Sequence, residues 1–135
     1  MRTLQIRYVT TPKDANIWGH IRGGLLLDLG DEAAGLTALA YQKGKVVTKA
    51  VNNVVFNAAS KQGDVLNFYG EITSVGHTSM NVHIDVEAEH LLDAGEKFAC
   101  EVVKVMSADY IYVAVDDNFN PVAVQHQLEG ATPAQ

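Results

Sequence analysis

The sequence has little cysteine and proline: a single cysteine, Cys100, and three prolines occur among 135 residues. One thiol cannot form an internal disulfide, and this composition is typical of proteins in a reducing compartment. Residues 1–11 lack the apolar segment of a signal peptide, and no apolar run is long enough to span a bilayer. These absences predict a cytoplasmic protein with no membrane partner.

Positive charge is also scarce, because 10 lysines and arginines stand against 16 aspartates and glutamates, for a net charge of −6. A nucleic-acid-binding protein needs a basic face that displaces counterions from the phosphate backbone. The composition therefore predicts no nucleic-acid partner. It is compatible with a small local basic pocket for a phosphate-bearing ligand.

Several motifs of catalysis and cofactor binding are missing. The glycine-rich dinucleotide and P-loop patterns and the G-x-S-x-G elbow do not occur. Cys100, in the strand-like stretch FACEVV, has no evident histidine partner, and we expect it to fill space in the core. None of the five histidines has the spacing of a helical zinc pair, and His83 with Asp85 provides only two ligands. We therefore expect neither a metal nor a cofactor.

The remaining composition, 47% apolar and 19% charged, is typical of a folded globular chain. We expect one domain over residues 1–120 and a loosely ordered tail over 121–135, where periodicity is lost. Residues 4–9 alternate in polarity and predict a short strand. Residues 11–21 are rich in turn-forming residues and predict a loop.

Residues 24–41 show the periodicity of a helix. Apolar residues occupy two sides of its helical wheel: Leu25, Leu29, Ala33, Leu36 and Ala40 on one, and Leu27, Ala34 and Ala38 on the other. A helix that is apolar nearly all round is predicted to be buried nearly all round.

Four strand-like segments follow, at 45–57, 64–75, 78–89 and 97–115. Segment 78–89 alternates most clearly, with Met80, Val82, Ile84, Val86 and Ala88 on one face and Asn81, His83, Asp85, Glu87 and Glu89 on the other. One long helix followed by an antiparallel meander predicts an α+β hotdog fold, in which a curved antiparallel sheet wraps a long central helix.

Asp31 is the principal catalytic candidate. It projects from a helix that has little solvent-facing surface, among small residues that allow close approach, and a buried carboxylate is costly unless it is paired or used. Asp28 and Glu32 are four residues apart on the same helix, and we interpret both as structural.

Two further groups could contact a ligand through the backbone. Gly23 and Gly24 precede the helix, where free amides and the positive end of the dipole can hold an anion or polarise a carbonyl. Gly76, Thr78 and Ser79 form a turn whose hydroxyls and amides could contact a phosphate, although a plain hairpin explains the same pattern.

Taken together, these residues resemble the hotdog acyl-CoA thioesterases of the YciA type and the brain acyl-CoA hydrolase type. The resemblance covers about residues 6 to 118 and keeps order and spacing. It is carried by Asp14, Asn16 and Gly19 before the pair Gly23-Gly24, by Asp31 in DEAA, by Phe56, by Gly63-Asp64, by Gly76, Thr78 and Ser79, and by VAVD ending at Asp116.

The resemblance implies hydrolysis of the thioester of fatty acyl-CoA to free acid and coenzyme A. It gives Asp31 the role of general base or nucleophile, Asn16 a contribution from the partner subunit, and Gly24 that of polarising the carbonyl. Gly23, Gly76, Thr78, Ser79 and Arg22 are expected at the coenzyme A site, with Lys43, Lys45 and Lys104 as further candidates for the phosphates. Coenzyme A is part of the substrate here and no separate cofactor. The resemblance implies a homodimer as the minimal unit and a homohexamer, a trimer of dimers.

Two other functions are compatible with the residues. One is a hotdog-type hydratase acting on enoyl or hydroxyacyl thioesters, with Asp14 and His20 as its acid and base pair. The other is a non-catalytic module that binds acyl-CoA.

Overall fold

The structure is a computed structural model that describes residues 1–94 and 97–125. It contains one long helix, α1 (Gly23–Gln42), and a single turn of 3-10 helix, η1 (Pro12–Asp14). The strands are β1 (Thr3–Val9), β2 (Val46–Phe56), β3 (Val65–Val75), β4 (Ser79–Ala94) and β5 (Lys97–Ala114). Every predicted helix and strand is present, and β4 extends five residues past the predicted end at 89.

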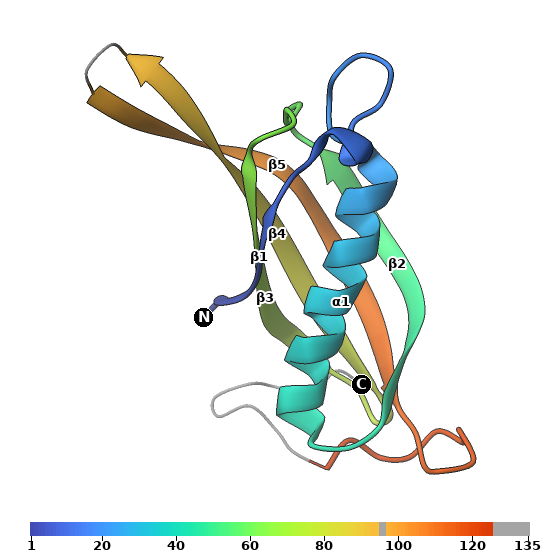
Figure 1. Ribbon diagram of the computed structural model, residues 1–135. Helices are drawn as coiled ribbons and strands as arrows, with labels where there is room; N and C mark the ends of the chain where they lie inside the picture. The colour runs from blue at the N-terminus through green and yellow to red at the C-terminus, as the bar shows by residue number, and fades with distance from the viewer. Residues whose placement is uncertain (95–96, 126–135) are drawn as a thin grey trace.

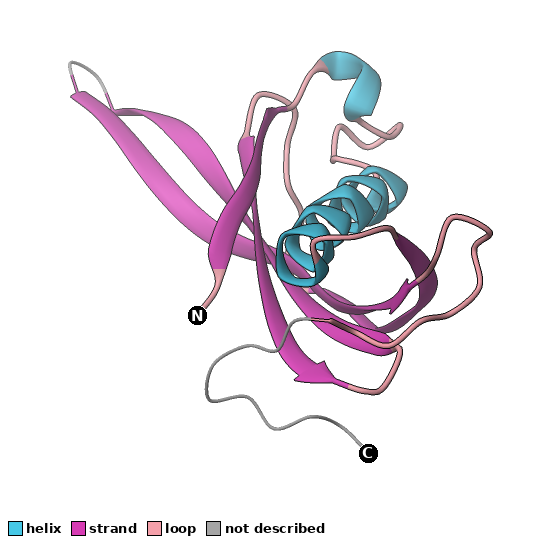
Figure 2. Ribbon diagram, turned by 90° about the horizontal axis from the view of Figure 1, so that it is seen from below, coloured by secondary structure: helices cyan, strands magenta, loops and turns pink. Residues whose placement is uncertain are grey.

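The strands form one antiparallel sheet in the order β1-β3-β4-β5-β2, which leaves β1 and β2 at its edges. Figure 1 shows α1 lying along one face of this sheet, and Figure 2 shows the sheet curving around the helix. The predicted α+β arrangement of a helix against a curved sheet is confirmed.

The core lies between α1 and the concave face of the sheet. Five residues of β4 point into it as the alternation predicts, and all are buried: Met80, Val82, Ile84, Val86 and Ala88. The alternate residues of β4 are half-buried on the opposite face. Small residues on the inner side of α1, Gly30, Ala33, Ala34 and Ala38, let the helix approach the sheet closely.

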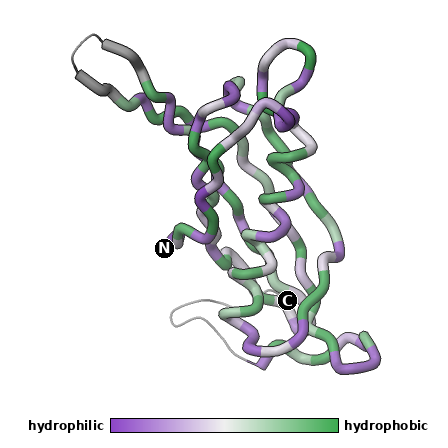
Figure 3. Tube along the Cα trace, in the orientation of Figure 1, coloured by the Kyte–Doolittle hydropathy of each residue, from purple (hydrophilic) through white to green (hydrophobic). Residues whose placement is uncertain are grey.

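The prediction that α1 is buried nearly all round is wrong for a single chain. Leu36 and Leu39 are 46% and 48% exposed, and Asp28 and Glu32 are exposed as well. One sheet can cover only one side of a helix, so the apolar residues on the other side are left in the open. Figure 3 shows the hydrophilic segments that interrupt the helix.

The prediction that Cys100 fills the core is also wrong, because its side chain is exposed. β3 pairs with β4 only as far as Glu89, and beyond that point β4 and β5 pair with each other alone. The resulting hairpin projects from the body of the molecule (Figure 1). Cys100 lies on this projection, where no helix covers the alternating pattern.

The segment after β5 is held to the body as far as it is described. The Val122 amide donates to the Ala114 carbonyl at 2.9 Å, and the Val124 amide donates to the His77 carbonyl at 2.8 Å. Residues 126–135, the rest of the predicted tail, lie outside the described residues. No helix within the described ranges combines the length and apolar character needed to cross a membrane.

Candidate active site

Asp31 lies half-buried in the middle of α1 and is bound by two hydroxyls. Thr48 Oγ1 donates a hydrogen bond of 2.8 Å to Asp31 Oδ1. The Tyr112 hydroxyl donates to the same oxygen at 2.6 Å and lies 2.7 Å from the Asp31 carbonyl oxygen. Among residues 1–94 and 97–125, no donor reaches Oδ2. One oxygen of the carboxylate is therefore held and the other is free.

Thr48 and Tyr112 reach the same carboxylate because they are direct partners across the β2–β5 pair. Residues opposite each other in an antiparallel pair present their side chains to the same face of the sheet. That face is the one on which α1 lies. The strand register therefore determines which hydroxyls meet Asp31.

Burial keeps the neighbouring phenols protonated. It raises the pKa of Tyr112 above the ordinary value, and the hydrogen bond to Asp31 raises it further. Burial also raises the pKa of Tyr110, whose hydroxyl donates to the Leu27 carbonyl at 2.8 Å. Both side chains are hydrogen-bond donors throughout the physiological pH range.

The first amides of α1 are open at its N-terminal end. Arg22 is the N-cap, and its side chain makes no capping hydrogen bond. In the part of the chain that the structure describes, neither the Gly23 nor the Gly24 amide has an acceptor. Free amides at the positive end of a helix dipole can polarise a carbonyl oxygen.

A cavity of about 410 Å³ adjoins this helix end. Gly23, Leu26, Phe56 and Ala58 are among the residues that line it. A Cβ atom at Gly23 would lie 3.1 Å from the Phe56 ring, whereas a Cβ atom at Gly24 would meet nothing within 4 Å. The cavity is mainly apolar and opens next to the free amides.

Asn16 lies exposed in the loop before α1. Its side-chain Oδ1 accepts hydrogen bonds from the backbone amides of Trp18 at 2.9 Å and His20 at 3.1 Å. Its amide nitrogen, Nδ2, donates to no other described residue. The Asn16 N–H groups therefore have no acceptor among the described residues and are available to a ligand or a second chain.

A single chain does not bring the three predicted catalytic residues together. Gly24 and Asp31 are seven positions apart along α1, about 10 Å at the helical rise of 1.5 Å per residue. Within the described ranges, no hydrogen bond links Asp31 to Asn16 or to Gly24. The free amides and the carboxylate of one chain are too far apart to act on one carbonyl group.

The predicted coenzyme A residues lie at two different places. Arg22 and Gly23 are at the N-terminal end of α1. Gly76 and Thr78 in the turn between β3 and β4, with Ser79 at the start of β4, lie near the C-terminal end of α1 (Figure 1). The helix has 20 residues, so these ends are about 30 Å apart. In the turn, the Gly76 amide donates to the Ser79 carbonyl at 2.8 Å.

Asp14 and His20, the acid and base of the hydratase alternative, are not paired. Asp14 is buried, and its Oδ2 accepts hydrogen bonds from the Tyr8 hydroxyl and from the amide and hydroxyl of Thr11. Burial raises the pKa of Asp14, but these hydrogen bonds lower it more, so the pKa is below its ordinary value. His20 is exposed. Asp14 thus stays ionised and stabilises the turn through these hydrogen bonds.

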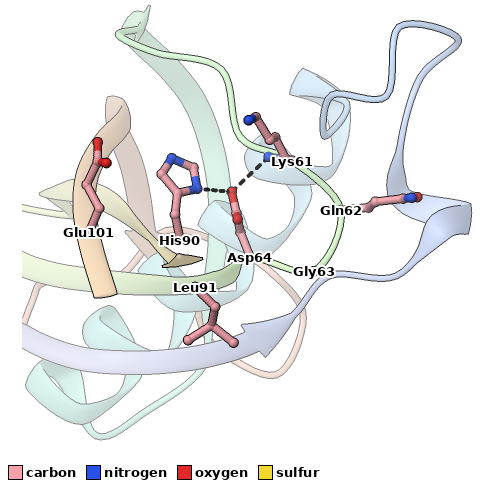
Figure 4. A pocket seen from close by; sticks show the side chains of 7 residues that line it. All are labelled: Lys61, Gln62, Gly63, Asp64, His90, Leu91 and Glu101. Atoms are coloured by element: carbon pink, nitrogen blue, oxygen red, sulfur yellow. Dashed lines mark hydrogen bonds and ion pairs between the residues drawn. The ribbon is translucent and has the colours of Figure 1, made fainter. Parts of the chain in front are cut away.

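A second cavity, of about 540 Å³, lies at the base of the projecting hairpin (Figure 4). In it His90 Nδ1 lies at ion-pair distance, 2.6 Å, from Asp64 Oδ2. The same oxygen accepts hydrogen bonds from the Lys61 amide at 2.8 Å and the Ser60 hydroxyl at 3.0 Å. Asp64 thus ties the loop before β3 to strand β4. Across the described residues, no group of three or more His, Cys, Asp or Glu side chains is placed to hold a metal ion.

Sequence reasoning missed two residues of the site, Thr48 and Tyr112. Each is an ordinary strand residue by its local pattern, and nothing near either in the sequence distinguishes it. Only the pairing of β2 with β5, and the position of α1 over that pair, places their hydroxyls on Asp31.

Comparison with known proteins adds independent evidence. The sequence model of the thioesterase superfamily matches residues 19–94. An uncharacterized acyl-CoA thioester hydrolase of Zymomonas mobilis is 32% identical over 121 residues, which cover 88% of this chain and 76% of that protein. The acyl-CoA thioester hydrolase YciA of Salmonella typhimurium is 31% identical over 120 residues, 87% of this chain and 86% of YciA. By contrast, the chain spans only 30% of the length of the rat cytosolic acyl coenzyme A thioester hydrolase.

The fold has a close counterpart in a hexameric hotdog fold thioesterase of Campylobacter jejuni. That structure superposes with a TM-score of 0.83 at 28% identity and covers 90% of both chains. The predicted hotdog fold and the resemblance to YciA-type enzymes are thereby confirmed. This chain belongs to the thioesterase superfamily and has the hotdog fold.

Proposed function

We propose that this protein hydrolyses the thioester bond of fatty acyl-CoA, releasing the free acid and coenzyme A. The observation that carries the proposal is the Asp31 carboxylate, which projects from the middle of α1 with one oxygen held by Thr48 and Tyr112 and the other free. Relatives named as acyl-CoA thioester hydrolases support the substrate class.

In the proposed reaction Asp31 is a general base. Oδ2 removes a proton from a water molecule, and the water oxygen attacks the thioester carbonyl carbon. The negative charge that develops on the carbonyl oxygen is stabilised by the free Gly24 amide of a second chain. When the carbon–sulfur bond breaks, the departing thiolate takes the proton from Asp31, which restores the carboxylate.

A nucleophilic route uses the same residue. Oδ2 attacks the carbonyl carbon, the coenzyme A thiolate leaves, and water then hydrolyses the mixed anhydride. When the water attacks the Asp31 carboxyl carbon of the anhydride, its oxygen ends up in Asp31, whereas in the general-base route it enters the fatty acid. Isotope-labelled water detects this difference.

We propose that each site is assembled from two chains. Asp31 and Gly24 of one chain are about 10 Å apart along α1, and Leu36 and Leu39 expose an apolar surface on the same helix. A partner whose α1 lies against this surface would bring its own Gly24 and Asn16 to Asp31. The minimal unit is then a homodimer, and the hexameric assembly of the Campylobacter jejuni relative supports a homohexamer.

The same arrangement accounts for the divided coenzyme A residues. Gly76, Thr78 and Ser79 of one chain are far from Arg22 of the same chain. These three residues and an Arg22 would therefore bind one coenzyme A molecule only where two chains meet at an interface. Lys43 and Lys45 lie beyond the C-terminal end of α1, on the same side as that turn. We expect the phosphates of coenzyme A there, and we expect the reaction to need no metal and no cofactor.

We further propose that the protein acts in the cytoplasm. The exposed free thiol of Cys100 suits a reducing compartment, and the related rat enzyme is named as cytosolic.

The deciding experiment is a thiol-release assay on the purified chain, with saturated acyl-CoA substrates of increasing length. We expect free acid and coenzyme A thiol to be released in equal amounts. Binding of acyl-CoA without thiol release would favour the non-catalytic module. Hydration of an enoyl-CoA that is lost in His20→Ala would favour the hydratase.

A further inference from the structure

We infer that Tyr112 is a positioning residue for Asp31: its hydroxyl holds the carboxylate so that one oxygen stays engaged and the other stays free for the substrate. This inference rests on the proposed function, because it concerns how the proposed base is presented. It assigns a role in the reaction to a buried residue of β5.

The contact is made at two points of the same residue. The Tyr112 hydroxyl is 2.6 Å from Asp31 Oδ1 and 2.7 Å from the Asp31 carbonyl oxygen. Its single proton is shared between these two acceptors. Because one acceptor belongs to the helix backbone and the other to the side chain, the hydroxyl links the orientation of the carboxylate to the helix itself.

The second donor reinforces the same choice. A free aspartate turns readily about its terminal bond and exchanges its two oxygens. Thr48 Oγ1 donates to Oδ1 as well, at 2.8 Å. With two hydroxyls on one oxygen, turning the carboxylate out of this plane would break both hydrogen bonds, so the plane stays fixed and the second oxygen stays without a donor among the described residues.

The position of Tyr112 is fixed by its surroundings. Its side chain is 5% exposed, and its strand, β5, is paired with β4 on one side and β2 on the other. Gly35 makes room for it, since a Cβ atom there would lie 3.1 Å from the Tyr112 hydroxyl. Burial keeps its pKa above the ordinary value, so the phenol remains a donor.

Tyr110 provides a matched control two residues earlier on β5. It is buried, it faces the same helix, and its hydroxyl donates to a helix carbonyl one turn earlier, that of Leu27, at 2.8 Å. It makes no hydrogen bond to a carboxylate among the described residues. Tyr110→Phe and Tyr112→Phe therefore remove equivalent helix-to-sheet hydrogen bonds, and only Tyr112→Phe releases Asp31.

The experiment measures kcat, KM and the thermal midpoint of both variants of the full chain, with an acyl-CoA that the wild type hydrolyses. Displaced catalytic groups cost rate more than binding, so we expect Tyr112→Phe to lower kcat by about tenfold or more with KM within about twofold. Tyr110→Phe should keep kcat within about twofold while lowering the thermal midpoint similarly.

NMR spectroscopy reports on the Asp31 carboxylate without depending on enzymatic activity. In protein labelled with ¹³C-carboxyl aspartate, the Asp31 signal is assigned by its loss in Asp31→Asn. We expect this signal to shift or broaden in Tyr112→Phe and to stay in place in Tyr110→Phe. If the wild type releases no thiol and the signal still moves, the proposed function fails while the positioning contact stands.

Thr48 keeps the inference testable if Tyr112→Phe does not fold. Thr48 is exposed on the edge strand, so its variants should fold. Thr48→Val removes the second donor and should lower kcat with KM nearly unchanged, and Thr48→Ser should restore it. The inference is overturned if Tyr112→Phe matches Tyr110→Phe in kcat and leaves the Asp31 signal unmoved, or if Thr48→Val has wild-type kcat.

Discussion

Thr48 on the edge strand β2 donates a hydrogen bond of 2.8 Å to Asp31 Oδ1 on α1. Of the strands that frame Asp31, β2 is the one at the edge of the sheet, and its residue 48 is exposed. The catalytic candidate thus sits where helix and sheet edge meet, next to the surface that a second chain would cover. A site in this position depends on both the fold of one chain and the approach of another.

Asp31→Asn should lower kcat by at least about a hundredfold, because the amide keeps the volume and can still accept the Thr48 hydrogen bond but cannot act as a base. Binding of acyl-CoA, measured by calorimetry, should persist. Since the side chain is only half-buried, the thermal midpoint should stay close to that of the wild type. Near wild-type turnover in this variant would show that the carboxylate is structural.

Mixed oligomers test whether the site is shared. Asp31→Asn and Asn16→Ala proteins should each be impaired, and co-expression should restore activity in those sites that combine wild-type Asp31 from one chain with wild-type Asn16 from another. For random pairing in a two-fold symmetric dimer, about one quarter of the sites are restored. Activity no higher than that of either parent would place both residues of a site in one chain.

Isotope labelling separates the two chemical routes. After many turnovers in H₂¹⁸O, the general-base route puts ¹⁸O into the fatty acid alone and leaves Asp31 unlabelled. Mass spectrometry of the peptide that contains Asp31 makes the measurement, with Asp31→Asn protein as the control. Label in the Asp31 carboxylate would identify the nucleophilic route through an anhydride.

Chelation should leave turnover unchanged. The described residues offer no cluster of three metal-ligating side chains, and the proposed reaction uses a carboxylate and backbone amides. Thiol release after prolonged dialysis against a chelator should equal that of untreated enzyme, once the chelator is removed. Loss of activity that added zinc reverses would require a metal-assisted mechanism.

The outer face of the sheet carries a charge cluster that links stability to pH. His83 Nδ1 lies 2.8 Å from Asp109 Oδ1, and Nε2 lies 3.2 Å from Asp85 Oδ1. Partial burial lowers the pKa of His83, but the hydrogen bond to Asp109 and the charge of Asp85 raise it more, so the net pKa is above the ordinary 6.5. Lys104 and Arg2 also approach Asp85, at 3.3 and 3.9 Å.

Because the pKa of His83 is raised in the folded state, its stabilising contribution is complete below pH 6.5 and is lost as the pH rises through the folded value. The pKa of Asp109 is lowered, since hydrogen bonds from Asn53 and His83 outweigh its burial, so its contribution is lost as the pH falls through a value below 3.8. The free energy of unfolding, measured by urea denaturation, should therefore decline from about pH 6 to pH 9, by up to about 1 kcal/mol for a partly exposed pair. His83→Gln should flatten this decline, and an unchanged slope would contradict the assignment.

The sequence by itself determined the elements and the principal catalytic candidate. Periodicity placed α1, all five strands and the buried face of β4, because spacing along the chain translates directly into a face of a helix or strand. Asp31 was found for the same reason, as a carboxylate among small residues of a largely apolar helix. The resemblance to hotdog thioesterases rests on residues that keep their order and spacing.

Only the tertiary structure decided what surrounds those residues. The burial of Cys100 is predicted from the strand-like stretch around it, yet the hairpin that carries it extends past β3, beyond the part of the sheet that α1 covers in the described ranges. Leu36 and Leu39 were expected to be buried, but one sheet covers one side of a helix. Thr48 and Tyr112, 64 residues apart by their numbers, meet Asp31 through the β2–β5 register, which no local pattern encodes because it depends on how the whole sheet pairs and on where α1 lies across it.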